Sequence, residues 1–286
     1  MTKEFQQPAS SGHSATDQTS MDSKAKSKHA AVRNRHQEIL EIIGESGFAS
    51  IQALADHFGV TPQTIRRDLN TLSDSGMVLR FHGGAGLSVS TENVDYADRK
   101  VLFLPEKKRI ALMTANHIPT RASLFINIGT TTEEVAKNLF SHERLRVITN
   151  NLNVAKILAD HSNVEVIVAG GLVRQRDCGI VGEAASDFIR QFKVDYGIIG
   201  ISGIDLDGTL LDFDYREVRT ARAIIENSRK VFLVADHSKI GRNAMVRLGS
   251  IEEIDALFTD RQPPGELVEV LNRAEVELHV ADSEEV

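Results

Sequence analysis

The sequence contains a single cysteine, Cys178, among 286 residues. One thiol excludes an internal disulfide and a cysteine-based metal cluster, and it favours a reducing compartment. Hydrophobic runs are short, and none approaches the roughly 18 residues that a membrane helix needs. The first residues also lack the apolar segment of a secretory signal. We therefore expect a cytoplasmic protein that does not span a membrane.

Positive charge is scarce overall, because the 33 lysines and arginines are outnumbered by 40 acidic residues. A net charge of −7 argues weakly against a nucleic-acid partner for the chain as a whole. The distribution is more informative, since residues 1–87 are balanced and all the surplus acid lies beyond them. Residues 24–35 hold five cations and no acid, which predicts a loose basic arm or merely a solvated segment. The polar composition of residues 1–31 predicts a disordered tail.

Residues 32–87 show helical periodicity and then a short strand. Ser50 can cap a second helix, and Gly59 ends it. A third helix begins at Thr61-Pro62, a good N-cap followed by a residue that suits the first helical position. Residues 77–84 then predict a strand that enters a Gly-Gly hairpin. Three helices and a β wing are the winged helix-turn-helix plan, in which the third helix enters the major groove of DNA.

The third helix places Ile65, Leu69 and Leu72 on one apolar stripe and leaves the polar residues of its first turns off it. Arginine suits guanine, glutamine suits adenine, and threonine suits a methyl group or a phosphate. Side chains of the wing suit the DNA backbone or the minor groove. An ordinary three-helix bundle with exposed arginines is the alternative. The predicted DNA-binding residues are Thr61, Gln63, Thr64, Arg66, Arg67, Arg80 and His82.

After a polar segment at 88–104, which predicts a linker, short apolar runs alternate with amphipathic stretches over 105–286. Runs such as 122–128 and 231–235 predict strands, and the stretch 131–140 predicts a helix. The alternation predicts an α/β domain with a mainly parallel sheet covered by helices on both faces. Such sheets bind ligands beside the carboxyl ends of their strands.

Glycines, hydroxyls and cations follow several of these strands. The amide groups and dipole of a helix N-terminus attract anions, and three threonines open a helix directly after Gly129. We expect a small phosphorylated ligand, with no metal and no cofactor. Ordinary helix capping and solvated loop charges are the alternatives. The candidate ligand-binding residues are Gly129, Thr130, Thr131, Thr132, Asn150, Gly170, Gly171, Gly182, Asp236, Lys239 and Arg242.

The segment DLDGT at 205–209 has the letters with which dehalogenase-type phosphatases begin. In those enzymes the first aspartate follows a buried strand directly and attacks phosphorus. Here residues 200–203 separate Asp205 from the predicted strand, and no G-D-x-x-x-D metal-binding motif follows. Asp207-Gly208 is also a favourable hairpin dipeptide. We therefore predict a turn and no phosphatase.

Several longer motifs resemble the DeoR family of bacterial transcriptional regulators. The DNA-binding part carries VTPQTIRRDL at 60–69, and the α/β part carries INIGTTT at 126–132 and ADHSKIG at 235–241. The resemblance covers about residues 32–280. The motif GIDLDGTLLDFDYREVRT at 203–220 is most similar to that of family members that regulate glycerol metabolism.

The resemblance implies a repressor that binds double-stranded operator DNA as a homo-oligomer, either a dimer or a tetramer. It implies release of that DNA by sn-glycerol 3-phosphate, and no catalytic residues. It also implies that residues 105–286 sense the effector, mediate oligomerisation and are related to sugar-phosphate isomerases. A regulator that senses a different sugar phosphate is the main alternative. An enzyme resembling an isomerase or a deaminase would not explain the DNA-binding part.

Overall fold

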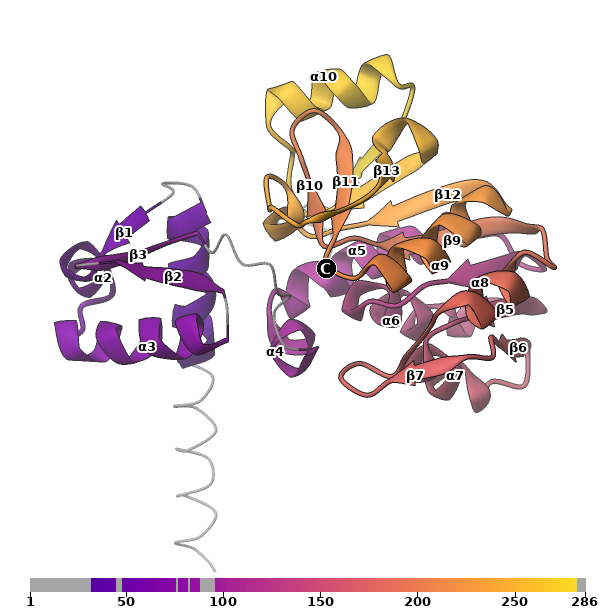
Figure 1. Cartoon of the computed structure of the whole chain (residues 1–286), viewed down its shortest axis with the longest axis horizontal. Coiled ribbons are helices and arrows are strands. Elements are labelled where there is room, and N and C mark those ends of the chain that lie inside the picture. The colour runs from indigo at the N-terminus through magenta and orange to yellow at the C-terminus, as the bar shows by residue number, and fades with distance from the viewer. Residues whose placement is uncertain (1–31, 45–47, 76, 82, 88–95, 282–286) are drawn as a thin grey trace, which may run out of the picture.

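A computed structural model describes residues 32–44, 48–75, 77–81, 83–87 and 96–281 (Figure 1). The predicted tail, the wing residue His82 and residues 88–95 lie outside this description. The described chain forms a small N-terminal part and a larger C-terminal part, which lie side by side in Figure 1. No helix among the described residues is long and apolar enough to cross a membrane.

The N-terminal part, which we call the head, combines three helices with a small antiparallel sheet. Residues 32–44 form its first helix. The other elements are β1 (Phe48–Ser50), α2 (Ile51–Phe58), α3 (Pro62–Asp74), β2 (Val78–Phe81) and β3 (Gly84–Leu87). The sheet order is β1-β3-β2, so a strand before α2 pairs with the wing. The winged helix-turn-helix prediction is confirmed, whereas β1 was not predicted.

Local sequence accounts for the ends of α2 and α3. The Ser50 hydroxyl accepts a hydrogen bond from the Ala53 amide at 3.1 Å, and Gly59 ends α2 in the left-handed conformation with φ of 60°. The Thr61 hydroxyl accepts from the Thr64 amide at 3.2 Å, and Pro62 follows it. These contacts join residues only three apart, so the sequence alone is enough to predict them.

Arg33 and Arg35, which the sequence places in a loose basic arm, lie in the helix at 32–44. Arg35 Nε donates to Asp68 Oδ2 at 2.7 Å, and His36 Nε2 lies 3.0 Å from Oδ1 of the same carboxylate. Asp68 belongs to α3 and is only 5% exposed. The loose-arm prediction is therefore wrong for Arg35, because its guanidinium fastens the first helix to α3. Residues 24–31 of the predicted arm lie outside the described residues.

The C-terminal part, which we call the sensor, contains a seven-stranded sheet whose neighbouring strands are all parallel. In spatial order the strands are β15 (Glu277–Val280), β14 (Ala256–Thr259), β12 (Ser228–Val234), β9 (Val194–Gly200), β4 (Ser123–Ile126), β5 (Leu145–Thr149) and β6 (Val164–Val168). This confirms the predicted parallel α/β fold.

Helices cover both faces of this sheet. One face packs against α5 (Leu104–Asn116), α6 (Thr130–Lys137) and α7 (Leu152–Ala159), and the other against α8 (Glu183–Ile189), α9 (Tyr215–Glu226) and α10 (Gly265–Arg273). Side chains of β4 alternate accordingly, with Phe125 in one core and Leu124 and Ile126 in the other. Burial on both sides explains why the strands are continuously apolar.

Smaller elements lie in the connections between the strands of this sheet. They are β7 (Leu172–Arg174), β8 (Gly179–Val181), β10 (Gly203–Ile204), β11 (Thr209–Asp212), β13 (Val246–Ser250) and the short 3₁₀ helices η1 (Leu139–Ser141), η2 (His237–Lys239) and η3 (Ile251–Glu253). Strands β10 and β11 form an antiparallel hairpin. Its turn is the DLDGT segment, closed by the Thr209 amide donating to Asp207 Oδ1 at 2.8 Å with Gly208 at φ of 86°. The predicted turn is confirmed.

The order of the strands places a topological switch point between β4 and β9. After β4 the chain continues through β5 to β6 on one side, and from β9 it continues through β12 and β14 to β15 on the other. Connections that leave a sheet in opposite directions open a crevice outside the carboxyl ends of the two strands. The fold therefore predicts a ligand site beside residues 127–131 and 200–202.

The segment 88–104 was predicted to be a linker, yet residues Tyr96–Val101 form a helix, α4. The Tyr96 hydroxyl contacts Glu133 on α6 at 2.8 Å and accepts a hydrogen bond from Asn153 Nδ2 at 2.9 Å. The buried Lys107 ammonium donates to the carbonyls of Arg99 and Leu102 at the end of α4. This helix is consequently packed onto the sensor, at the point where the chain arrives from the head.

Polar contacts between described residues join the head to the sensor. Arg261, which follows β14, donates to Glu41 of the first helix at 3.0 Å. Gln37, one turn earlier on that helix, donates to Glu106 of α5 at 3.4 Å. The first helix therefore contacts α3 within the head and the sensor outside it.

Candidate functional site

A polar pocket lies at the switch point and encloses about 440 Å³ including its open mouth. Residues that follow β4 and β9 form its base, and α4, β11, α9 and η2 supply the rest of the wall. We call it the switch-point pocket. Its lining residues are Arg99, Ile128, Gly129, Thr130, Thr131, Gly200, Ile201, Ser202, Asp212, Glu217, Val234 and Lys239.

One side of the pocket is suited to an anion. Gly129 precedes the first turn of α6, and its φ of 155° brings Thr130 and Thr131 to the pocket wall. A Cβ atom at Gly129 would lie 3.2 Å from the Thr132 hydroxyl, so a larger residue would crowd this turn. The first amides of a helix have no acceptor within the helix and carry the positive end of its dipole. These amides suit a phosphate group.

Cationic side chains accompany this helix N-terminus. Lys239 on η2 and Arg99 on α4 both line the pocket. Burial lowers the pKa of Lys239 to about 7; Asp236 opposes this shift, whereas Arg242 and Lys107 add to it. Burial alone would raise the pKa of Asp236, but Lys239 and Lys107 hold it below its ordinary value. Cations that repel one another in a buried site are stabilised by an anionic ligand.

The wall also holds two carboxylates. Asp212 Oδ1 accepts hydrogen bonds from the Ser202 hydroxyl at 3.0 Å and the Phe213 amide at 2.6 Å. Glu217 Oε2 accepts from Arg174 at 2.6 Å. Burial raises the pKa of Asp212, whereas burial and then Asp212 itself raise the pKa of Glu217 to about 7. The pair therefore retains protons at a pH where ordinary carboxylates are fully ionised.

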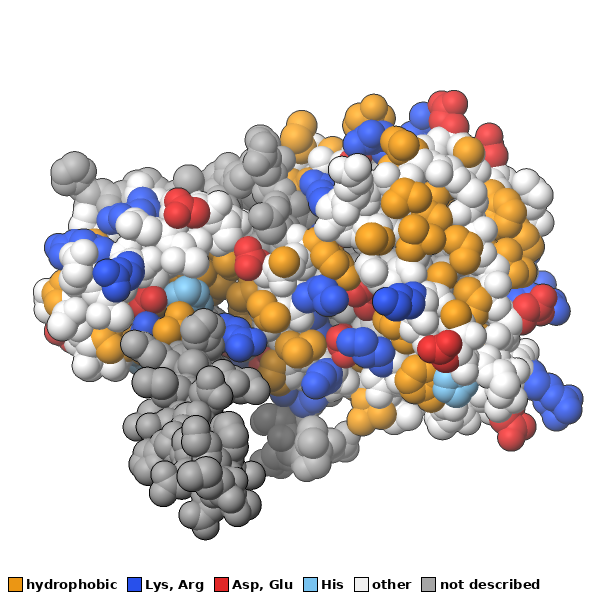
Figure 2. Space-filling view, turned by 90° about the horizontal axis from the view of Figure 1, so that it is seen from below, with side chains coloured by type: hydrophobic (Ala, Val, Ile, Leu, Met, Phe, Trp, Pro, Cys, Tyr) orange, Lys and Arg blue, Asp and Glu red, His pale blue; other side chains and the backbone are white. Residues whose placement is uncertain are grey.

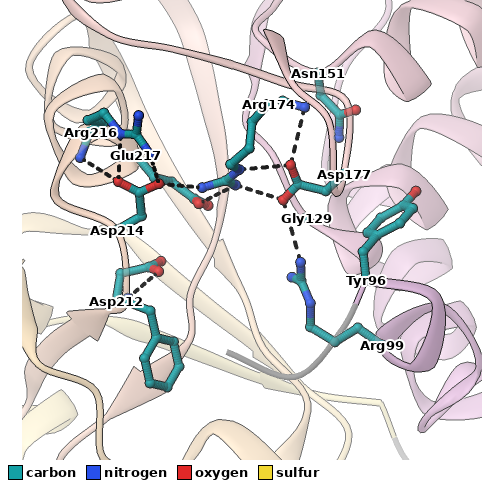
Figure 3. A network of polar contacts seen from close by, with 12 residues as sticks. Tyr96, Arg99, Gly129, Asn151, Arg174, Asp177, Asp212, Asp214, Arg216 and Glu217 are labelled. Carbon is teal, nitrogen blue, oxygen red and sulfur yellow. Dashed lines mark hydrogen bonds and ion pairs between the residues drawn. The ribbon is translucent and has the colours of Figure 1, made fainter. Parts of the chain in front are cut away.

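A network of ion pairs holds this side of the pocket in place (Figure 3). Arg174 donates to Asp177 at 2.7 Å, to Asp214 at 2.9 Å and to Glu217 at 2.6 Å. Arg99 reaches the same network from α4, with its guanidinium 3.5 Å from Asp177. The network thus connects β7, α9 and α4, and it positions Glu217 and Arg99 at the wall of the pocket.

Buried polar atoms without a hydrogen-bond partner gather at the same edge of the sheet. Within the described part of the chain, those that end or closely follow strands are Asn127 Oδ1, Asn150 Oδ1, Asp236 Oδ2, His237 Nε2 and Thr259 Oγ1. Buried polar groups normally have partners. Their concentration along β4, β5, β12 and β14 marks this edge as the functional side of the sensor.

Four of the predicted ligand-binding residues line the switch-point pocket: Gly129, Thr130, Thr131 and Lys239. Asp236 and Arg242 lie behind them. Asp236 caps η2, and Arg242 lies over the Phe213 ring at 5.1 Å and donates to the Ser202 carbonyl at 3.3 Å.

The remaining predicted residues lie away from the pocket wall. The Thr132 hydroxyl points back into its own turn and donates to the carbonyls of Asn127 and Gly129. Asn150 is fully buried and donates to the Ile180 carbonyl at 3.1 Å. Gly170 and Gly171 precede the β7–β8 hairpin, and Gly182 begins α8.

Sequence reasoning missed four polar lining residues: Arg99, Ser202, Asp212 and Glu217. Arg99 was hidden in a segment interpreted as a linker. The other three lie in or beside the motif at 203–220, in which the DLDGT letters drew attention to the turn. The spacing of Asp212, Asp214 and Glu217 at the start of a helix was the only local signal.

The head presents a polar helix face. Gln63, Arg66 and Arg67 are exposed on the first turns of α3, while Ile65, Leu69 and Leu72 are fully buried. Arg80 on the wing strand β2 is exposed and donates to Asn70 of α3. Figure 2 shows lysine and arginine side chains on the face of the head that is seen from below. An exposed helix face next to a β wing is the arrangement of a DNA-reading surface.

A winged helix-turn-helix head joined to an α/β sensor whose pocket is suited to an anion defines the class of ligand-responsive DNA-binding proteins. Family models agree with this class: the DeoR-like helix-turn-helix domain matches residues 35–91, and the DeoR C terminal sensor domain matches residues 103–261. The chain belongs to the DeoR family of transcriptional regulators.

Relatives within the family are similar over most of their length. The chain is 54% identical to the glycerol-3-phosphate regulon repressor of Escherichia coli (strain K12), over 86% of this chain and 98% of that protein. It is 52% identical to the Haemophilus influenzae repressor of the same name, over 81% and 90%. It is 40% identical to the Escherichia coli HTH-type transcriptional repressor CsqR, over 85% and 94%.

Among solved structures, the chain is similar to ribose 5-phosphate isomerase from Plasmodium falciparum. The TM-score is 0.35 at 13% identity, over 47% of this chain and 52% of that one. A likeness of this size says nothing about activity.

Proposed function

We propose that this protein represses genes of glycerol and glycerol 3-phosphate metabolism, and that sn-glycerol 3-phosphate releases it from operator DNA. The observation that carries the proposal is a pocket with a helix N-terminus and two cations in the same chain as a winged helix-turn-helix. The names of relatives that are more than half identical support glycerol 3-phosphate as the effector. The cytoplasm, where bacterial DNA lies, is the proposed location.

In this proposal residues 32–87 bind DNA, with α3 in the major groove and the wing beside it. Thr61, Gln63, Thr64, Arg66 and Arg67 contact bases and phosphates, and Arg80 and His82 contact the backbone or the minor groove. The exposure of the arginines on α3 supports this assignment, because neither has a role in the core.

A gel-shift series tests the DNA-binding surface. Arg66→Ala or Arg67→Ala should weaken binding to DNA upstream of glycerol genes by roughly 1–3 kcal/mol if that side chain holds a guanine with two hydrogen bonds. Glu41→Gln, on the helix face toward the sensor, is the control at matched salt. Operator binding equal to wild type in both arginine variants would remove α3 from the recognition surface.

We further propose that residues 105–286 sense the effector, and that the candidate residues Gly129, Thr130, Thr131 and Lys239 hold its phosphate. Asp236 and Arg242 support Lys239 from behind. Titration calorimetry of the full chain with sn-glycerol 3-phosphate and with several hexose and pentose phosphates tests this part. Tighter binding of another sugar phosphate would favour the second candidate, a DeoR-type repressor with a different effector.

The same sensor is also proposed to join copies of the chain into a dimer or a tetramer. Large apolar side chains are exposed on β6 and β7, with Val168 39%, Leu172 63% and Val173 44% accessible. Hydrophobic side chains also gather on the sensor surface in Figure 2. Exposed apolar patches commonly mark interfaces. Sedimentation analysis of wild type and Leu172→Glu measures the assembly.

No catalytic role is proposed. The relatives are named as repressors, and Asp205 lies in a hairpin turn instead of at the end of a buried strand. Asp205→Asn should therefore leave operator binding and effector response unchanged. Hydrolysis of a phosphate ester that disappears in this variant would contradict the assignment.

A further inference from the structure

The switch-point pocket presents both signs of charge to a ligand. The α6 N-terminus, Lys239 and Arg99 supply positive charge. Asp212, only 7% exposed, and Glu217, whose carboxylate accepts from Arg174 at 2.6 Å, line the same pocket. A small ligand whose phosphate lies against the α6 N-terminus therefore shares the pocket with these two carboxyl groups.

Carboxyl groups discriminate strongly between an uncharged and an anionic group of a ligand. An ionised carboxylate only accepts hydrogen bonds, so it pairs well with an alcohol and repels a second anion. A protonated carboxyl group can also donate to an alcohol oxygen. Burial raises the pKa of Asp212, and burial and then Asp212 raise the pKa of Glu217 to about 7, so that Glu217 is present in both its protonated and its ionised form near neutral pH. The pair can therefore both accept from hydroxyl groups and donate to them.

The surrounding contacts hold the pair at the wall of the pocket. Asp212 is fixed by Ser202 and by the Phe213 amide, both of which reach Oδ1. Glu217 is fixed through Arg174, which is itself held by Asp177 and Asp214. Among the described residues, no group of three or more His, Cys, Asp or Glu side chains is arranged to hold a metal ion.

We propose that Asp212 and Glu217 determine the effector class: the pocket admits a phosphomonoester with an uncharged, hydroxylated end and rejects phosphorylated carboxylic acids and bisphosphates. This inference rests on the proposed effector site and extends it to the end of the ligand away from the phosphate. It explains how a pocket rich in cations discriminates among small phosphorylated metabolites that share the same phosphate.

A matched pair of achiral ligands tests the proposal. 2-Hydroxyethyl phosphate and 2-phosphoglycolate differ only in having a CH₂OH group or a carboxylate beyond the phosphate-bearing carbon. Calorimetry on the full chain should give wild type a preference of roughly tenfold or more for the alcohol, because like charges repel in a buried site. Asp212→Asn and Glu217→Gln should each narrow that ratio by improving the binding of 2-phosphoglycolate.

Glu226→Gln is the matched control. Glu226 is the last residue of α9, is half exposed, pairs with Arg222 and does not line the pocket. Its replacement should leave the ratio of the two affinities as in wild type. Thermal unfolding of each variant separates a loss of fold from a change of preference, since misfolding lowers both affinities together.

The outcomes are distinct. A ratio that stays constant in Asp212→Asn and Glu217→Gln, or that moves equally in Glu226→Gln, overturns the assignment of the two carboxyl groups. If wild type binds none of the phosphomonoesters, sn-glycerol 3-phosphate included, the proposed effector site itself fails. Binding of sn-glycerol 3-phosphate together with an unchanged ratio would leave the proposed function standing and remove only this specificity.

Discussion

At the scale of single residues, Lys239 links the pocket to pH. Burial, with Arg242, Lys107 and Arg99 nearby, lowers its pKa to about 7 against the opposing effect of Asp236. The side chain is therefore mostly charged at pH 6.5 and mostly neutral at pH 8.5. A bound phosphate, already dianionic above its second pKa of about 6, would raise the pKa of Lys239 again.

We expect effector affinity to fall by roughly tenfold as the pH rises from about 6.5 to 8.5, because binding requires the protonated amine. Binding near pH 7.5 should also take up a proton, which calorimetry in buffers of different ionisation enthalpy detects. Glu217 titrates in the same range, so Lys239→Arg isolates the lysine, since a guanidinium stays charged throughout. The same pH dependence in Lys239→Arg would exclude the lysine as its source.

In the head, Asp68 is the residue that links stability to pH. Burial alone raises its pKa, but hydrogen bonds from His36 and Arg35 hold the pKa below the ordinary value of 3.8. A lowered folded-state pKa means that the ionised carboxylate stabilises the head above about pH 4, and that this contribution is lost as the pH falls through the folded pKa.

Asp68→Asn should therefore lower the stability of the head by about 1–3 kcal/mol at pH 7, because Arg35 and His36 lose a charged partner. The difference from wild type should shrink toward pH 3. Thermal unfolding followed by circular dichroism measures both. Asp74→Asn, at an exposed position of the same helix, is the control and should have no comparable effect.

At the scale of elements, α4 connects the pocket to the DNA-binding head. It follows the segment that leaves the wing, it carries Arg99 into the pocket, and Tyr96 ties it to Glu133 of α6. A ligand that attracts Arg99 changes the balance between Arg99 and Asp177. An effector shifts a conformational equilibrium only through contacts that differ between its two states, and Arg99 offers such a contact.

Arg99→Ala should leave operator affinity in the absence of effector close to that of wild type, since Arg99 is remote from α3. The effector concentration needed for half-release should rise by about ten- to hundredfold, the cost of one charged hydrogen bond. Gel shifts titrated with sn-glycerol 3-phosphate give this value. Lys100→Ala, the exposed neighbour on α4, should respond as wild type does. A normal response in Arg99→Ala would exclude α4 as the effector contact.

At the scale of the whole molecule, a second connection runs from the pocket to the first helix of the head. His237 and Lys239 are the two ends of η2, so one short helix carries both side chains. The His237 ring and its backbone amide both lie 2.7 Å from Asp260. Arg261, next in the chain, reaches Asp260 at 3.7 Å and Glu41 at 3.0 Å. A chain of contacts therefore runs from His237, two residues before Lys239, through Asp260 and Arg261 to Glu41 of the head.

Arg261→Glu should alter the effector concentration for half-release by no more than about fivefold, because an exposed ion pair contributes at most about 1 kcal/mol. The double variant Glu41→Arg with Arg261→Glu reverses the pair and should restore the wild-type value. Gel shifts with both variants at low salt measure this. Equal deviations in the single and double variants would show that the contact plays no part in coupling.

How much of this structure could be predicted depends on the distance between interacting residues along the chain. The sequence by itself determined the elements whose causes are local: the Thr61-Pro62 start of α3, the Gly59 stop of α2, the apolar strands and the DLDGT turn. The threonines after Gly129 were predicted for the same reason, since a helix N-terminus is made by adjacent residues.

Only the tertiary structure decided which side chains meet. Arg35 pairs with Asp68, 33 residues away, and Arg99 enters the pocket from a segment that looked like a linker. Glu217 and Lys239 lie on separate elements, and both line one pocket with Gly129 because β4 and β12 lie on either side of β9 in the sheet. The order of the strands sets these juxtapositions, and local periodicity carries no information about it, because every strand of a parallel sheet buried on both faces has a similar apolar pattern.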